Sequence, residues 1–256
     1  MSKIENYKNL ICILTISLVI LSCGESETPH VSVLPLIEGA ELHFRGFVTD
    51  EEEELVSEIH NFSRKVIRKD TLDGHPVHAY VYYNQQIYFY TDENGTVWQY
   101  NTEDIGSRIV AYGLSFRAPI LVSYWQILLK VDEGVGTEWS VSVDTTFDAI
   151  NLAGNTERIH YMHDGKARYA GWTKTYIPER HNYVRVADAH WYELNTYIIN
   201  ETTGDTLFSS HGTAHQYFEP KLGAIKYITD FTKAEIGQSA VPLRGTWELM
   251  RKNIPE

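Results

Sequence analysis

The sequence predicts a mainly β protein, built as an antiparallel curved sheet, a sandwich or a partly open barrel, with one or two short helices. Three observations favour this fold class. Apolar residues recur with a period of two in many segments, as in half-buried strands. Aromatic residues that suit a pleated surface are frequent, with 17 Tyr, 9 Phe and 6 Trp. Asp-Gly and Asn-Gly pairs separate several of these segments and favour tight hairpin turns.

The first 22 residues have the pattern of an export signal. Lys3 and Lys8 precede an apolar run over residues 10–21, and this run is too short for the roughly 20 apolar residues of a membrane-spanning helix. The run ends in "ILSCG" at residues 20–24, which resembles the lipobox of bacterial lipoproteins. Two alternatives stay open: a plain signal peptide with an incidental cysteine, or an uncleaved anchor helix.

The lipobox resemblance implies a lipid anchor. Residues 1–22 would be removed as a lipoprotein signal peptide, Cys23 would become the first mature residue and carry acyl chains, and residues 23–40 would form a polar tether. Because each buried lipid CH₂ contributes about 0.8 kcal/mol, two or three chains on one residue would hold the protein at a membrane durably. We therefore expect palmitate on Cys23 and an outer-membrane location in a bacterial cell envelope.

Cysteine count and charge exclude several functions. The cysteines are Cys12 and Cys23, so a mature, lipidated domain would hold no free thiol for disulfides, zinc ligation or nucleophilic catalysis. The net charge of −12 repels phosphate backbones, so we expect no nucleic-acid partner.

The elements follow from the alternation pattern. The sequence between residues 158 and 172 reads as two strands about an Asp164-Gly165 turn. Strands are expected over 41–48, 77–83, 86–92, 96–100, 137–147, 158–172, 190–199, 205–211, 224–231 and 246–252. Residues 49–62 have an aspartate near their start and apolar residues at helical spacing, which favours a short helix, with a long edge strand as the rival. A second short helix is expected within residues 229–237. No linker divides residues 41–256, so they form a single domain.

Three segments together carry a family resemblance. They are "RKDTLDGHPVHAYVYY" (68–83), "LLKVDEGVGTEW" (128–139) and "YFEPKLGAIKY" (217–227). This combination is similar to β-rich lipoproteins of Bacteroidota and related bacteria that have no assigned reaction. The resemblance implies an antiparallel β fold and an outer-membrane address, and it brings no catalytic residue with it.

Aromatic residues supply the candidate ligand site. Tyr82, Tyr88, Tyr90 and Trp98 lie in successive expected strands and could stack on sugar rings or line an apolar groove. The alternative is that they form the core and its rim, because Tyr and Trp combine apolar bulk with a polar tip.

No pattern identifies a catalytic residue, a cofactor or a metal site. The histidine pairs His75/His78 and His160/His163 are spaced three apart, so on a strand their side chains point to opposite faces. "HGTAH" at residues 211–215 lacks the glutamate of the zinc-protease motif. Carboxylates that could form a glycosidase pair are Asp132, Glu133, Glu138, Asp144 and Glu193.

These observations predict a lipid-anchored envelope protein that acts as a non-catalytic binding or structural module. Its partner would be a glycan, a hydrophobic ligand or another envelope protein, and the membrane itself through Cys23. The alternative is a glycan-active hydrolase with paired carboxylates. A lipid carrier would show an apolar concave face, a glycan binder aromatic rings beside polar side chains, and an enzyme two converging carboxyls in a cleft.

Overall fold

The computed structural model describes residues 37–82, 85–92, 94–116 and 119–255. The expected signal segment, Cys23 and the first part of the tether lie outside the described residues. Among the residues that are described, no helix is both long enough and apolar enough to cross a lipid bilayer.

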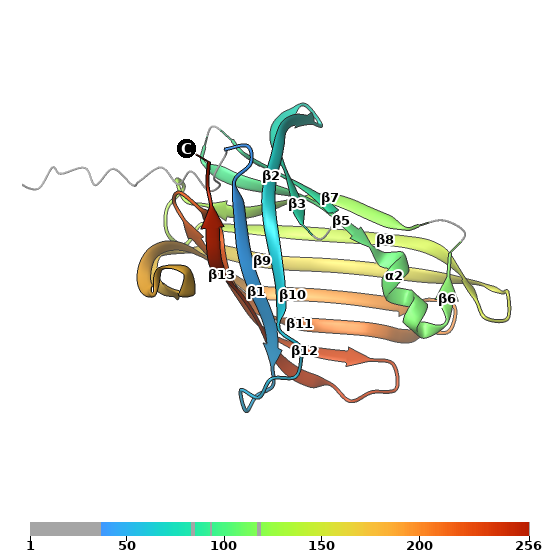
Figure 1. Cartoon of the computed structure of the whole chain (residues 1–256). Coiled ribbons are helices and arrows are strands. Elements are labelled where there is room, and N and C mark those ends of the chain that lie inside the picture. The colour runs from blue at the N-terminus through green and yellow to red at the C-terminus, as the bar shows by residue number, and fades with distance from the viewer. Residues whose placement is uncertain (1–36, 83–84, 93, 117–118, 256) are drawn as a thin grey trace, which may run out of the picture. The chain divides into compact units, whose positions relative to one another are not determined.

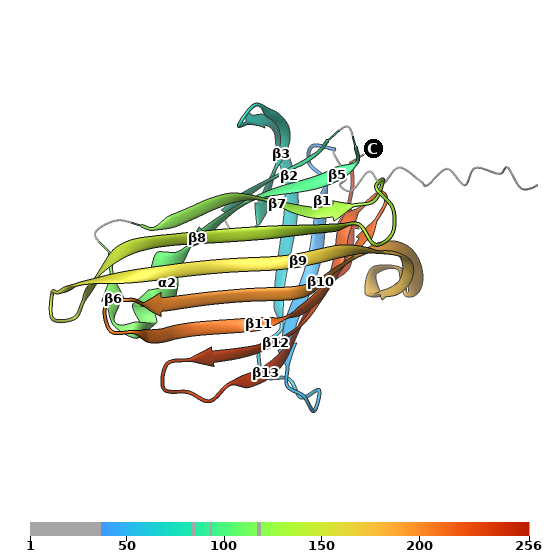
Figure 2. The same cartoon turned by 180° about the vertical axis from the view of Figure 1, so that it is seen from behind.

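The described residues form one antiparallel sheet of 13 strands (Figures 1 and 2). The strands are β1 (Glu41–Thr49), β2 (His60–Leu72), β3 (His75–Tyr82), β4 (Gln85–Thr91), β5 (Thr96–Asp104), β6 (Leu114–Ser115), β7 (Leu121–Lys130), β8 (Glu138–Asn151), β9 (Thr156–Ile177), β10 (Asn182–Asn200), β11 (Asp205–Glu219), β12 (Gly223–Glu235) and β13 (Val241–Asn253). The hydrogen-bonded order is β6-β8-β9-β10-β11-β12-β13-β1-β2-β3-β4-β5-β7. The sheet starts at β6 and ends at β7 without closing, which confirms the expected fold class.

Most neighbours in the sheet are also neighbours in the chain, with one long-range exception. β1 pairs with β13, with Glu41 opposite Asn253, and β2 lies on its other side. The first and last described strands therefore lie together in the middle of the sheet (Figure 1). The hairpin turn at Asp73-Gly74 has φ values of 51° and 82°, as the sequence predicts.

The helix expected over residues 49–62 is wrong. The Asp50 carboxylate accepts a hydrogen bond from the backbone N–H of Glu54 at 2.9 Å, and Leu55 forms an isolated β-bridge with Thr49. The aspartate thus closes a local turn instead of capping a helix. Leu55 is 53% exposed, so the apolar residues of this segment have no surface to pack against as a helical face.

Two other expectations in the C-terminal part are also wrong. Residues 229–235 continue β12 as a strand instead of forming a helix, because they pair along β11. Residues 156–177 form one uninterrupted strand, β9, instead of two. Gly165 is needed there for space and not for a turn, since a Cβ at this position would lie 2.9 Å from Leu194 Cδ2.

The described residues contain one short α-helix, at a place the sequence analysis missed. α2 (Ile105–Ile109) follows β5 directly, and the Asp104 carboxylate caps it by accepting a hydrogen bond from the Ser107 N–H at 3.1 Å. Ile105 and Ile109 are fully buried. This helix leads through a 3₁₀ turn, η1 (Val110–Tyr112), into the edge strand β6.

Candidate functional site

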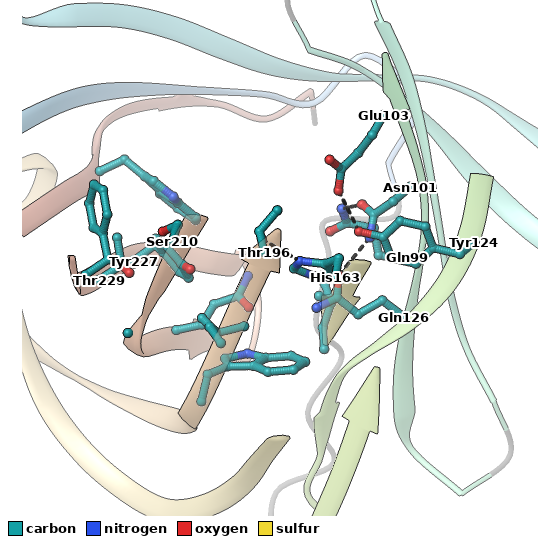
Figure 3. Close-up of a pocket in the computed structure, with 17 residues that line it drawn as sticks. Gln99, Asn101, Glu103, Tyr124, Gln126, His163, Thr196, Ser210, Tyr227 and Thr229 are labelled. Atoms are coloured by element: carbon teal, nitrogen blue, oxygen red, sulfur yellow. Dashed lines mark hydrogen bonds between the residues drawn. The ribbon is translucent and has the colours of Figure 1, made fainter. Parts of the chain in front are cut away.

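A cavity of about 460 Å³ lies between two parts of the curved sheet. Strands β5 and β7 form one wall, and strands β9 to β13 form the other (Figure 3). The lining combines amide, hydroxyl and aromatic side chains: Gln99, Asn101, Glu103, Tyr124, Gln126, Leu128, His163, Trp191, Leu194, Thr196, Ser210, Gly212, Gln216, Tyr227, Thr229, Phe231 and Trp247.

A chain of three amide side chains forms one wall of the cavity. The Gln99 side-chain amide donates to the Asn101 side-chain oxygen, and the Asn101 amide donates to Gln126 Oε1 at 2.7 Å (Figure 3). Within the described structure this leaves the Gln126 amide nitrogen as a free donor at one end of the chain and the Gln99 oxygen as a free acceptor at the other. The wall therefore offers both hydrogen-bonding roles to a ligand.

Glu103 supplies the carboxylate of the cavity lining, and its two oxygens are engaged by three donors. Tyr124 Oη donates to Oε1 at 2.8 Å, Tyr161 Oη donates to Oε2 at 3.0 Å, and Arg108 Nη2 lies 3.0 Å from Oε2. Burial raises the pKa of the Tyr124 and Tyr161 hydroxyls well above their ordinary value, and the negative charge of Glu103 raises both further. Both hydroxyls therefore remain protonated donors.

His163 is an uncharged side chain in the same cavity. Its Nδ1 lies 3.0 Å from the Thr196 hydroxyl oxygen, and the two residues come from the neighbouring strands β9 and β10 (Figure 3). Burial lowers the pKa of His163 below the usual value of 6.5. At neutral pH the ring is consequently neutral, with one nitrogen that donates and one that accepts.

Gln216 is buried without a partner. Its side chain is 7% exposed and lines the cavity, yet its amide forms no hydrogen bond to any residue that the structure describes. Within the described part of the chain, the fully buried side-chain atoms without a partner lie elsewhere, for example on Tyr80, Trp139 and Trp172, so the Gln216 amide keeps access to the cavity and is open to a ligand. Ser210, on the same strand and in the same lining, also has no hydrogen-bond partner among the described residues.

The aromatic residues proposed from sequence gather on the opposite face of the sheet. Tyr90 stacks on Trp98 with ring centroids 5.9 Å apart and an interplanar angle of 3°, and on His75 at 4.5 Å. Tyr88 packs edge-on against Tyr100 at 6.3 Å. The structure thus brings these three predicted residues together, with the faces of Tyr90 and Trp98 turned toward each other. Tyr82 ends β3, and its side chain lies outside the described residues.

The predicted carboxylates and histidines do not converge. None of the five proposed glycosidase carboxylates lines the cavity. Asp144 contacts His160 at 2.7 Å, and Glu193 contacts Lys166 at the same distance, each on an exposed strand surface. In the part of the chain that is described, no cluster of three or more His, Cys, Asp or Glu residues could hold a metal ion.

Sequence reasoning missed the residues that line the cavity. On β5, Gln99, Asn101 and Glu103 alternate with Trp98 and Tyr100, so the amides face the cavity and the aromatic rings face away. The period of two in the sequence of β5 is the signal that marks the amide face. The candidate site predicted from aromatic residues lies on the other face of the same strand.

The comparisons with known proteins concern the fold alone. No protein-family model matches the sequence, and no curated protein matches it. A solved structure from Parabacteroides distasonis, described as a "putative lipoprotein", is similar over 86% of this chain and 98% of its own, with 14% identity and a TM-score of 0.44. Another, from Bacteroides fragilis, described as a "putative exported protein with YmcC-like fold", covers the same shares with 8% identity and a TM-score of 0.34. At these values neither likeness carries an inference about what this chain binds.

Proposed function

We propose that this chain is a lipid-anchored protein of a bacterial envelope that binds a hydroxyl-rich ligand, such as a glycan, without transforming it. The observation that carries the proposal is the amide of Gln216, a residue that is 7% exposed and lines the cavity without a hydrogen-bond partner among the described residues. A ligand that fills the cavity would displace water from this amide, so it must exchange hydrogen bonds with it to avoid leaving it unpaired. The amide therefore favours a polar occupant.

The rest of the lining fits the same class of ligand. Gln126 offers a donor, and the Gln99 oxygen offers an acceptor. Nε2 of the neutral His163 ring, whose Nδ1 is engaged by Thr196, offers one more hydrogen-bonding position. Sugar hydroxyls donate and accept, so they match a mixed set of this kind. The indole rings of Trp191 and Trp247 add apolar surface to the lining, as sugar-binding sites often do for the C–H face of a ring.

The hydrolase alternative has less support from this cavity. Glycoside hydrolysis uses two carboxyl groups about 5–10 Å apart. The described lining provides one carboxylate, Glu103, whose oxygens already accept hydrogen bonds from two tyrosines. A carboxylate held in this way positions the tyrosine hydroxyls, and the described lining places no second carboxyl beside it.

The N-terminal sequence supports a location in the bacterial envelope. The apolar run, the sequence "ILSCG" and the polar segment that follows Cys23 together favour attachment through acyl chains on that cysteine. We place the domain at the outer membrane, as the sequence resemblance implies, with the cavity in the domain that the tether carries.

A Gln216→Met variant tests the binding proposal. Methionine has nearly the same length and cannot exchange hydrogen bonds, so we expect affinity for glycans on an oligosaccharide array to fall by about tenfold or more. Gln238→Met, at an exposed turn, is the matched control and should leave the glycan affinity unchanged. Unchanged glycan binding by Gln216→Met would contradict the proposal.

A further inference from the structure

We propose that the ligand is amphipathic, with a hydroxyl-rich head in the polar cavity and an apolar tail in an adjoining cavity. This inference rests on the proposed function and specifies its ligand class. The adjoining cavity has a volume of about 310 Å³ and lies between β1, β2, β12 and β13. Its lining is mostly apolar and includes Phe47, Val48, Phe62 and Trp247.

The two cavities share part of their lining. Tyr227, Thr229 and Trp247 line both of them. Tyr227 and Thr229 lie at the end of the polar cavity that is farthest from the amide chain of Gln99 and Asn101 (Figure 3). A molecule that passes these shared residues therefore leaves the amide-lined part and enters a part lined by hydrocarbon and aromatic surface.

Two glycines lie inside the strands that form the apolar cavity. Gly46 of β1 lies opposite Trp247 in the strand register, and Gly245 of β13 lies opposite Val48. Both glycines line the apolar cavity. Glycine is uncommon inside strands, because it packs no side chain and loses more backbone entropy than other residues, and it often marks the close approach of a ligand. A Cβ at Gly245 would lie 2.9 Å from Thr229 Cγ2, so the threonine occupies that space, whereas the nearest atom to a Cβ at Gly46 is 3.5 Å away. Gly46 is therefore the position where the missing side chain leaves room in the cavity.

The chemistry of the two cavities argues against a simpler occupant. A glycan alone would leave the apolar surface around Phe62 and Trp247 exposed to water, at a cost of about 25 cal/mol per Å² of apolar area. A lipid without a polar head would leave the Gln216 amide unpaired. A hydroxylated head joined to an alkyl tail satisfies both cavities at once.

Native mass spectrometry of the full-length chain, extracted from membranes in dodecyl maltoside, tests the inference. This detergent is itself the probe, since it joins a disaccharide head to an alkyl tail. We expect the wild-type chain to retain one dodecyl maltoside after the micelle is removed. Lauryldimethylamine oxide, which has the same alkyl length without hydroxyl groups, should not be retained. Maltose without a tail should bind about tenfold more weakly or less.

The variant Gly46→Val tests whether the apolar cavity holds the alkyl tail. A Cβ at Gly46 would lie 3.5 Å from Phe62 Cε1 and 3.7 Å from Trp247 Cβ, which is ordinary contact, and valine suits a strand. We therefore expect a folded protein whose apolar cavity is filled, with retention of dodecyl maltoside reduced about tenfold. Ser142→Val, on an exposed position of β8, is the matched control and should retain the probe.

The outcomes separate the inference from the proposed function. If maltose binds as tightly as dodecyl maltoside, or if Gly46→Val retains the probe as the wild type does, the amphipathic ligand is overturned and the glycan proposal remains. If the wild type does not retain dodecyl maltoside, the amphipathic ligand is also overturned, and the Gln216→Met experiment decides the glycan proposal separately. Equal retention of lauryldimethylamine oxide would likewise overturn the amphipathic ligand, and the Gln216→Met experiment would again decide the glycan proposal.

Discussion

His190 and His215 lie stacked on neighbouring strands, with ring centroids 4.3 Å apart and an interplanar angle of 3°, and their pKa values are shifted in opposite directions. The hydrogen bond from His215 Nδ1 to the Asp188 carboxylate, at 3.0 Å, raises the pKa of His215. Burial lowers the pKa of His190, and the positive charges of His215 and Arg168 lower it further.

His215→Gln should therefore change stability in a pH-dependent way. Because the folded-state pKa of His215 lies above the unfolded value of 6.5, its contribution is fully present below about pH 6.5 and is lost as the pH rises through the folded-state pKa. The pair is partly exposed to solvent, so we expect the variant to lose about 0.5–1 kcal/mol near pH 5.5. Thermal unfolding of wild type and variant should give a Tm difference that shrinks as the pH is raised to about 9.

The neighbouring histidine is the control for that experiment. His190 has a lowered pKa, so its neutral form is the one that the fold favours, and protonation costs stability as the pH falls below about 6.5. His190→Gln should therefore make the protein less sensitive to acid, which is the opposite trend. A Tm difference for His215→Gln that is the same at all pH values would contradict the assignment of its charge.

Glu103→Ala should destabilise the fold through the hydroxyls it leaves behind. Tyr161 is fully buried and would keep an unpaired O–H, and Tyr124 would lose its acceptor as well. We expect a loss of about 2–3 kcal/mol in the free energy of unfolding, measured by urea titration. Glu133→Ala removes an exposed ion pair with Lys130 and should cost less than about 1 kcal/mol. Similar losses for the two variants would rule out the Glu103 network as a stabilising unit.

Gly212→Ala and Gly46→Ala should differ sharply although both glycines line cavities. A Cβ at Gly212 would lie 2.1 Å from the backbone oxygen of Asp230, so β11 and β12 must move apart, at a cost of about 1–3 kcal/mol or more. The nearest atom to a Cβ at Gly46 is 3.5 Å away, and alanine there should leave the Tm unchanged or raise it slightly. A thermal scan of both variants measures the difference, and equal Tm values would contradict the close approach of the two strands.

Labelled palmitate tests the anchor. The wild-type chain should incorporate the label in cells, and Cys23→Ala should lose it by about tenfold or more, because we propose that the lipid is attached at that sulfur. Cys12→Ala is the matched control, since Cys12 is the other cysteine of the chain and lies within the segment expected to be removed. Equal labelling of wild type and Cys23→Ala would contradict lipidation at residue 23.

The alternation of apolar and polar residues was sufficient to predict the fold class and most strands, since a half-buried sheet imposes that period directly. The errors arose where tertiary contacts override local preference. Gly165 follows an aspartate and so reads as a turn, yet it lies inside β9 because Leu194 occupies the space beside it. α2 was missed because five residues are too few to establish a helical period.

The candidate site was harder to predict for a different reason. Gln99 and Gln126 lie on β5 and β7, whereas Gln216 lies on β11, and all three line one cavity because the sheet curves. Alternation tells which residues share the face of one strand. It does not tell which strands face each other across a curved sheet, so the cavity could not be assembled from the sequence.

The pairing of β1 with β13 has a consequence for biogenesis. Glu41 finds its partner Asn253 only when the C-terminal strand is available, and contacts between such distant segments form slowly during folding. Until then β1 presents an unpaired edge that can associate with other chains. A chain with this topology must therefore be shielded from aggregation until its last strand is available for pairing, and a version truncated before β13 should accumulate as insoluble material.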